Sequence, residues 1–297
     1  MEKKKFIDIE NILKEKAAGL YRWLPRFAIS WLKKKLHEDE INSVMEELKD
    51  EHGLKFNKGV LRLLGAKVEA VHPEYIPATG NIILVSNHPL GGLDGMALIK
   101  VVGDVRTDVH FLVNDILTNI PNFGDVFVAV NKLGASSASA LRVMQETFRE
   151  GGAVLVFPAG LVSRRQKNGL IRDLSWKKSF VTQAIDNDRI VIPVFIEGQN
   201  SKFFYNLAYW RKRLGIKANI EMLFLPDEMF STNKKDIRIH FSKPFNSSAF
   251  NSSRSHKAWS DLVYKFIYSP EFMKGMSFEE YAATQPQNLE ASFTASK

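Results

Sequence analysis

The sequence predicts an α/β fold, with a mixed β-sheet flanked by helices and preceded by an N-terminal helical segment. Three observations lead to this class. Apolar residues such as Ile9, Ile12 and Leu13 fall at helical spacing in the first 60 residues. From Gly65 onward, strand-like runs that are apolar or alternate apolar with polar residues are interspersed with helical stretches, a pattern typical of α/β sheets. A length of 297 residues with 45% hydrophobic residues is enough for one large domain with a substantial core.

The N-terminal segment, residues 1–60, is predicted to be helical, with a break or kink at Pro25. Its stretch 20–35 mixes large apolar, aromatic and basic residues. Trp and Tyr beside Arg and Lys suit a membrane interface. A helix packed against the rest of the domain, with a solvated basic face, accounts for the same pattern equally well. Both interpretations stay open.

The middle segment, residues 61–250, carries the predicted sheet. Strands are expected at residues 67–71, 82–86, 109–113, 126–131, 153–157, 190–198, 220–224 and 236–241, and helices at 96–101, 136–144 and 176–185. Pro193 indicates that strand 190–198 lies at an edge or carries a bulge. The C-terminal segment, residues 251–297, is expected to hold a helix at 253–268 and then a polar tail.

Composition narrows the possible classes of function. The absence of cysteine excludes disulfides and thiolate chemistry and agrees with a reducing compartment. The net charge of +8 is compatible with nucleic acid, anionic lipid or phosphorylated partners, but no nucleic-acid-binding module is recognisable, so we expect no nucleic-acid partner. No secretory apolar core follows the charged N-terminus. The most apolar stretch, 81–102, contains His88, Pro89 and Asp94, which indicates strand, turn and helix rather than a membrane span.

The most informative stretch follows the apolar run Ile82–Val85. His88 comes directly after the predicted strand, and Asp94 lies six residues later, beyond a glycine-rich turn. Active sites of α/β sheets lie at this strand edge. A His side chain can act as a base near neutral pH, and a carboxylate on the far ring nitrogen fixes its tautomer. A capped turn with a half-buried His is the structural alternative. No other His or carboxylate has ligand spacing with His88, so no metal is expected.

Asn87-His88 followed by Asp94 resembles the N-H-x4-D signature of the glycerolipid (lysophospholipid) acyltransferase family. Five residues separate His88 from Asp94, where the family usually has four. Three later stretches resemble the family's other blocks in order, over residues 65–245. The turn His-Pro-x-Gly-Gly-x-Asp-Gly resembles the hemolysin-annotated bacterial subgroup in particular. The resemblance implies a glycerolipid acyltransferase-like fold, and acyl transfer from an acyl carrier protein or coenzyme A thioester with no other cofactor.

The resemblance also implies roles for individual residues. His88 takes the acceptor proton, Asp94 orients His88, and backbone N–H groups of Gly91 and Gly92 stabilise the oxyanion. Substrate-binding positions carried over from the signature and the second and third blocks are Asn87, Asn131, Phe157, Pro158, Gly160, Arg164 and Arg165. The two arginines stand in a basic stretch, 164–178, that fits either anion binding or a solvated surface. The aromatic stretch 203–214 fits an acyl tunnel, a membrane contact or core packing.

The third block departs from the family where Ala159 replaces a glutamate that engages glycerophosphate. This favours an O-acyltransferase whose acceptor is a lysolipid such as a lyso amino-acid lipid, for example lyso-ornithine or lyso-glycine lipid. The alternatives are a 1-acylglycerol-3-phosphate acyltransferase and a non-catalytic lipid-binding or hemolysin-like protein. The predicted location is cytoplasmic, peripheral on the inner face of the cell membrane.

Overall fold

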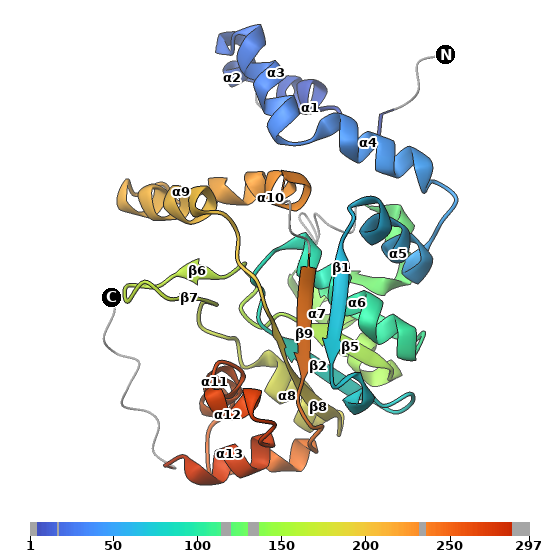
Figure 1. Cartoon of the computed structure of the whole chain (residues 1–297), viewed down its shortest axis with the longest axis vertical. Coiled ribbons are helices and arrows are strands. Elements are labelled where there is room, and N and C mark those ends of the chain that lie inside the picture. Colours follow the sequence, from blue (N-terminus) through green and yellow to red (C-terminus); the bar gives the residue numbers. More distant parts are fainter. Residues whose placement is uncertain (1–4, 17, 114–119, 130–136, 232–235, 287–297) are drawn as a thin grey trace.

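A seven-stranded mixed sheet with helices on both faces forms the centre of the computed structural model, which confirms the predicted fold class (Figure 1). The structure describes residues 5–16, 18–113, 120–129, 137–231 and 236–286. The strands of the sheet are β1 (Lys67–Val71), β2 (Ile82–Ser86), β3 (Val109–Val113), β4 (Phe127–Ala129), β5 (Ala153–Val156), β8 (Ile190–Ile196) and β9 (Asp236–Phe241). A separate antiparallel pair is formed by β6 (Arg164–Arg165) and β7 (Ile171–Arg172).

The strand order is β1-β9-β8-β2-β5-β3-β4, and every neighbouring pair is parallel except β8 with β9. β2 is therefore a central strand with parallel neighbours on both sides. All five of its residues are buried, as the continuous apolar run predicts for a strand covered on both faces. The carboxyl ends of β2, β5 and β8 meet at one edge, so the segments that follow them come together there.

Side chains on the two faces of β2 belong to two separate clusters of the hydrophobic core. Ile82 and Leu84 belong to the cluster shared with α5 (Gly53–Leu63) and α6 (Gly92–Val105). Ile83 and Val85 belong to the cluster on the other face, because successive side chains of a strand point to opposite sides. The described helices that contribute to that second cluster are α7 (Ser137–Glu150), α8 (Ser179–Asp186), α11 (His256–Ile267), α12 (Pro270–Met273) and α13 (Phe278–Thr284).

The N-terminal segment is helical, as predicted, and lies at one end of the molecule above α9 and α10 (Figure 1). Pro25 separates α2 from α3 by acting as the N-cap of α3. Within the described ranges, no helix has the length and apolar character needed to cross a bilayer. The remaining helices are α1 (Ile9–Lys16), α2 (Ala18–Trp23), α3 (Arg26–Lys35), α4 (Glu38–Glu47), α9 (Lys202–Arg213) and α10 (Leu225–Ser231), with 3-10 turns η1 (Pro73–Tyr75), η3 (Pro121–Val126), η4 (Ile220–Phe224) and η5 (Ser247–Ala249).

Two local predictions are wrong, those for the C-terminal tail and for residues 220–224. The chain after residue 268 is not a polar tail throughout, because it forms α12 and α13, and Phe278 of α13 is fully buried in the second core cluster. Residues 220–224 form the 3-10 helix η4 rather than a strand, because Glu221 turns inward to meet two arginines.

Pro193 lies in the interior of β8, between β9 and β2. On its β9 side Val194 pairs with Phe241 and Val191 with Phe245, so two residues of β8 face three of the opposite segment. The irregular pairing is a bulge, one of the two features that Pro193 predicts.

Candidate active site

His88 and Asp94 meet at the carboxyl edge of the sheet, as their order in the chain predicts. His88 follows β2, and Asp94 lies in the first turn of α6. His88 Nδ1 is 3.0 Å from Asp94 Oδ1, and the Asp94 side chain is fully buried. The second carboxylate oxygen, Oδ2, accepts the backbone N–H groups of Leu90 at 2.7 Å and Gly91 at 3.2 Å. The carboxylate is therefore held by three donors and points one oxygen at the imidazole.

The additional residue between His88 and Asp94 is accommodated by Gly91. Its φ of +85° lies in the region that favours glycine, and a Cβ there would come within 3.1 Å of the Leu225 side chain. The turn can thus fold back tightly enough to close the His88–Asp94 contact. The predicted oxyanion role of the Gly91 N–H is corrected, because this N–H already donates to Asp94. Gly92, the first residue of α6, lies next to Met229 of α10.

The environment of His88 favours a base with a defined tautomer. Burial lowers the pKa of His88, but the carboxylates of Asp94 and Asp173 together raise it by more, so that the net pKa lies above the ordinary value of 6.5. With Nδ1–H donating to Asp94, Nε2 is the nitrogen left to accept a proton. The ring stacks on Phe157 at 4.2 Å between centroids, with 19° between the planes, and the side chain is 17% exposed.

A second buried carboxylate, Asp173, was missed by the sequence analysis. Its Oδ1 accepts the backbone N–H of His88 at 3.1 Å and the Ser163 hydroxyl at 2.5 Å, while Oδ2 accepts the indole N–H of Trp176 at 2.9 Å. Burial raises the pKa of Asp173, whereas the hydrogen bonds from Ser163 and Trp176 lower it. Asp173 lies 85 residues from His88 in the chain, so no local motif could identify it.

Asp173→Asn is expected to lower the free energy of unfolding by about 1–3 kcal/mol, because the amide turns one of these bonds into a contact between two donors. The measurement is urea unfolding followed by tryptophan fluorescence and circular dichroism. Ser163→Ala, which removes one donor and leaves the carboxylate intact, is the matched control and should cost less. Equal stability of the Asn variant and the wild type would contradict the assigned hydrogen bonds.

Asn87 has a different role from the one predicted. Its side-chain amide donates to the carbonyl of Ile196 at 2.8 Å and accepts the Ile196 N–H at 2.7 Å. The residue is only 1% exposed. Both ends of the amide are thus used to join the end of β2 to the end of β8, so the substrate-binding prediction for Asn87 is corrected to a structural one.

The predicted third block gathers beside His88. Phe157 follows β5 and stacks on the imidazole. Pro158 is buried, and its carbonyl accepts the N–H of Lys177 at 3.1 Å. Gly160, with φ of +68°, closes a turn through its N–H to the carbonyl of Phe157. The block therefore shapes one wall of the site. Asn131, predicted to bind substrate, lies outside the described residues.

The two predicted arginines differ in surroundings. Arg165 is exposed and donates to Asn206 at 3.1 Å. Arg164 is largely buried, donates to Glu221 at 2.8 Å and lies over the ring of Phe204. Glu221 also pairs with Arg211 at 2.7 Å and is fully buried. One carboxylate is therefore shared by two guanidinium groups, which leaves this cluster with a net charge of +1.

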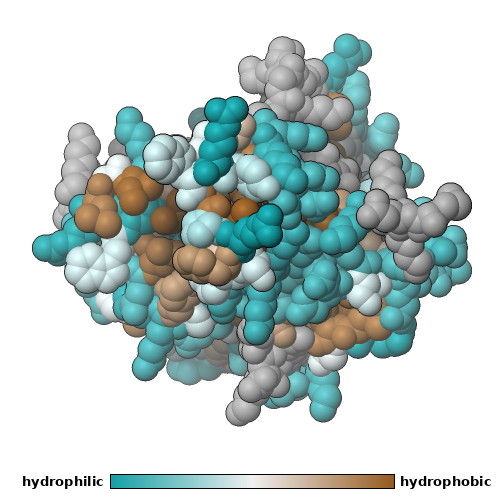
Figure 2. Space-filling view, turned by 90° about the horizontal axis from the view of Figure 1, so that it is seen from above, coloured by the Kyte–Doolittle hydropathy of each residue, from teal (hydrophilic) through white to brown (hydrophobic). Residues whose placement is uncertain are grey.

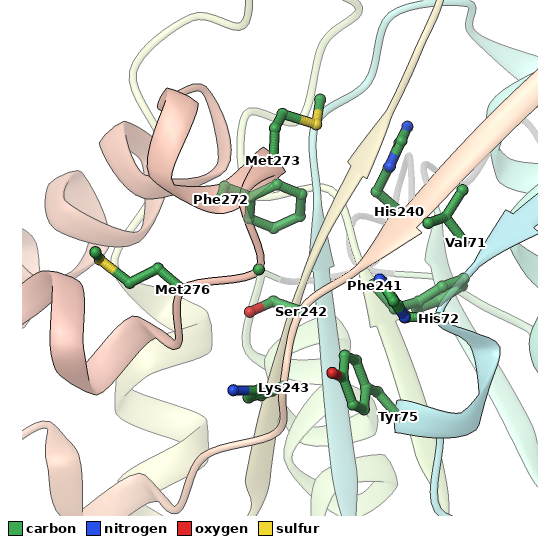
Figure 3. A pocket seen from close by; sticks show the side chains of 11 residues that line it. Val71, His72, Tyr75, His240, Phe241, Ser242, Lys243, Phe272, Met273 and Met276 are labelled. Atoms are coloured by element: carbon green, nitrogen blue, oxygen red, sulfur yellow. The ribbon is translucent and has the colours of Figure 1, made fainter.

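A hollow of about 50 Å³ lies away from His88, between β1, β9 and α12 (Figure 3). Its lining includes His72, His240 and Met273, and none of the predicted site residues. His240 Nε2 is 2.6 Å from Glu197, which places this carboxylate outside the His88 turn. The chemistry suggested by the sequence therefore lies at the β2 edge and not in this hollow.

The chain belongs to the Acyltransferase family, whose sequence model matches residues 11–275. The fold, together with a histidine and a carboxylate in contact at the sheet edge, agrees with this membership. The narrower resemblance to the hemolysin-annotated subgroup stays a prediction.

Two relatives are similar over almost their whole length. The chain is 43% identical over 263 residues to a lyso-glycine lipid O-acyltransferase of Bacteroides thetaiotaomicron, covering 88% of this chain and 96% of the relative. It is 41% identical to a lyso-glycine lipid O-acyltransferase of Phocaeicola vulgatus, covering 88% and 94%. A solved structure, the 1-acyl-sn-glycerophosphate acyltransferase PlsC of Thermotoga maritima, matches 80% of this chain and 87% of its own, with 21% identity and a TM-score of 0.45.

Proposed function

We propose that this protein is an O-acyltransferase that moves a fatty acyl group from an acyl thioester to the hydroxyl of a lyso amino-acid lipid, with lyso-glycine lipid as the favoured acceptor. The observation that carries the proposal is the 43% identity to a lyso-glycine lipid O-acyltransferase over 96% of that relative's length. The donor is a thioester of acyl carrier protein or coenzyme A. The setting is the cytoplasmic face of the cell membrane, where the protein is peripheral.

The proposed mechanism uses His88 as the general base. His88 Nε2 takes the proton of the acceptor hydroxyl while the hydroxyl oxygen attacks the carbonyl carbon of the thioester. The C–S bond then breaks, and the imidazolium returns the proton to the departing thiolate, which gives an ester and a free thiol. Asp94, at 3.0 Å, holds the Nδ1–H tautomer and stabilises the imidazolium. Gly92 N–H is the remaining proposed donor for the oxyanion.

The acceptor assignment gains support from the charge around Arg164. Arg164, Arg211 and Glu221 together carry one net positive charge, which suits a head group with a single carboxylate. A glycine attached through its nitrogen has such a head group, whereas a phosphate monoester at neutral pH approaches two negative charges. Ala159 also removes the glutamate that the glycerophosphate-type block carries. Arg164 is therefore the proposed head-group cation, and the role of the exposed Arg165 stays a prediction.

An acceptor panel tests the proposal. The purified protein is supplied with acyl carrier protein or coenzyme A thioesters and, in separate reactions, lyso-glycine lipid, lyso-ornithine lipid or lysophosphatidate, and products are identified by mass spectrometry. We expect an O-acylated glycine lipid and a preference for one of the two donors. Acylation of lysophosphatidate alone, or no ester with any acceptor, would refute the acceptor assignment or the transfer itself.

Membrane contact through the N-terminal helices is a further part of this proposal. Trp23 is 88% exposed and Phe27 is 77% exposed, on helices that also carry Arg22 and Arg26. Trp23→Glu with Phe27→Glu is expected to reduce the vesicle-bound fraction about tenfold, because carboxylates replace the two apolar anchors. Co-sedimentation with phosphatidylglycerol vesicles measures this, with Met273→Glu on α12 as the exposed control. Vesicle binding equal to that of the wild type would show that the N-terminal helices do not form the membrane contact.

A further inference from the structure

Two segments far apart in the chain have the same unusual charge. Residues 18–36, which hold α2 and α3, contain five Lys or Arg residues and no Asp or Glu. Residues 201–219, which hold α9 and the turn after it, also contain five Lys or Arg residues and no Asp or Glu. Lys33, Lys35 and Arg211 pair with carboxylates of neighbouring elements. The other basic residues of the two segments supply positive charge at one end of the protein.

The second segment also exposes large apolar side chains. Tyr209 is 52% exposed, Trp210 56% and Leu214 71%. The opposite side of α9 is buried: Phe204 and Tyr205 form a small core with Val162. The outward side chains are therefore neither core residues nor the lining of an enclosed acyl tunnel, two of the explanations that the sequence left open for this stretch.

The two segments meet. The ring of Trp31 on α3 is 6.3 Å from that of Phe224 in η4, and Phe224 is 5.2 Å from Phe203 on α9. Figure 1 shows α9 directly below the N-terminal helices, and Figure 2, which looks down onto this end, shows hydrophobic side chains gathered on one side of it. The exposed aromatic residues of α2, α3 and α9 thus belong to one end of the molecule rather than to two distant patches.

We propose that α9 and the turn after it form a second half of the membrane-docking surface, and that this surface binds an anionic lipid bilayer. Exposed aromatic and apolar side chains beside Lys212, Arg213 and Lys217 suit the head-group region of such a bilayer. Contiguous apolar patches on a soluble protein mark interaction sites. A bilayer satisfies both the apolar and the basic character.

The docking surface is connected to the His88 turn, which suggests a role in substrate delivery. η4 and α10 follow α9, and Leu225 of α10 lies against Gly91 of the His88 turn. The elements that follow α9 therefore link the docking surface to the His88 turn, where a lysolipid taken from the bilayer has to arrive. This consequence rests on the proposed acyl transfer, whereas the docking surface itself does not.

The test uses the full-length variant Trp210→Glu with Leu214→Glu, whose side chains project outward and leave the core of α9 intact. Binding is measured with phosphatidylcholine vesicles containing or lacking phosphatidylglycerol, at low and high salt. We expect the partition onto anionic vesicles to fall about tenfold or more, and wild-type binding to weaken as salt rises. Met273→Glu on α12 is the matched control, with binding like that of the wild type. Acylation of detergent-dispersed lysolipid by each variant is measured separately.

Three outcomes decide the proposal. A binding loss in the double variant with normal acylation in detergent supports it, and it stands even if no acceptor is ever acylated by the wild type. Vesicle binding equal to that of the Met273→Glu control overturns it. A raised KM for an acyl carrier protein donor, with vesicle binding unchanged, also overturns it and assigns the surface to a carrier protein instead.

Discussion

Replacement of His88 with alanine is expected to lower kcat for acyl transfer by at least about 10³-fold, because a positioned general base contributes rate factors of this order. The variant loses Nε2, the one ring nitrogen of this residue that Asp94 does not occupy. The measurement is ester formation from an acyl thioester and lyso-glycine lipid, under conditions where the wild-type rate is linear.

The structure supplies a control for this experiment. His88 also donates its backbone N–H to Asp173 and accepts the Ser163 N–H at its carbonyl, and alanine retains both of these bonds. His88→Ala should therefore keep the circular dichroism spectrum and vesicle binding of the wild type. A folded His88→Ala protein that retains full turnover would contradict the base assignment.

Asp94→Asn is expected to reduce kcat by about 10³–10⁴-fold through the tautomer of His88. Asp94 Oδ2 accepts two backbone N–H groups, so an asparagine at this position keeps its oxygen there and turns its NH₂ toward His88 Nδ1. The imidazole then accepts at Nδ1 and carries its hydrogen on Nε2, where the reaction needs a base. The substitution thus removes the acceptor that orients His88, although the asparagine side chain has nearly the same size as the aspartate.

The pH dependence separates this explanation from simple misfolding. The base works as neutral imidazole, so kcat/KM of the wild type should rise with pH through a pKa that Asp94 and Asp173 raise above its ordinary value. Without the Asp94 charge this pKa falls, and the acid limb of the residual activity should move to lower pH. An unchanged acid limb in the Asp94→Asn profile would contradict the assignment.

Local sequence patterns predicted most of the sheet. β1, β2, β3 and β9 occupy the expected residues, because a run of buried or alternating apolar residues depends only on neighbours in the chain. The stretch 220–224 failed because Glu221 between apolar residues imitates strand alternation, while its real partners are Arg164 and Arg211.

The candidate site divides in the same way. The contact between His88 and Asp94 could be predicted, because both residues lie in one strand-turn-helix unit. The roles of Asp173 and Glu221 could not, since their partners are 85 and 57 residues away. Asn87 was assigned to substrate because the motif places it beside His88, and only the β2–β8 pairing reveals that Ile196 occupies its amide.

The bond pair between Asn87 and Ile196 has a mechanical consequence. It joins β2 to β8 at the position where β2 ends and the His88 turn begins, so opening the sheet there to admit a fatty chain would break two buried hydrogen bonds. We expect a fatty chain near His88 to be accommodated by displacement of α10, whose Leu225 and Met229 lie on the turn through side-chain contacts. The Asn87–Ile196 bond pair would then keep the His88 turn in place on the sheet while α10 moves.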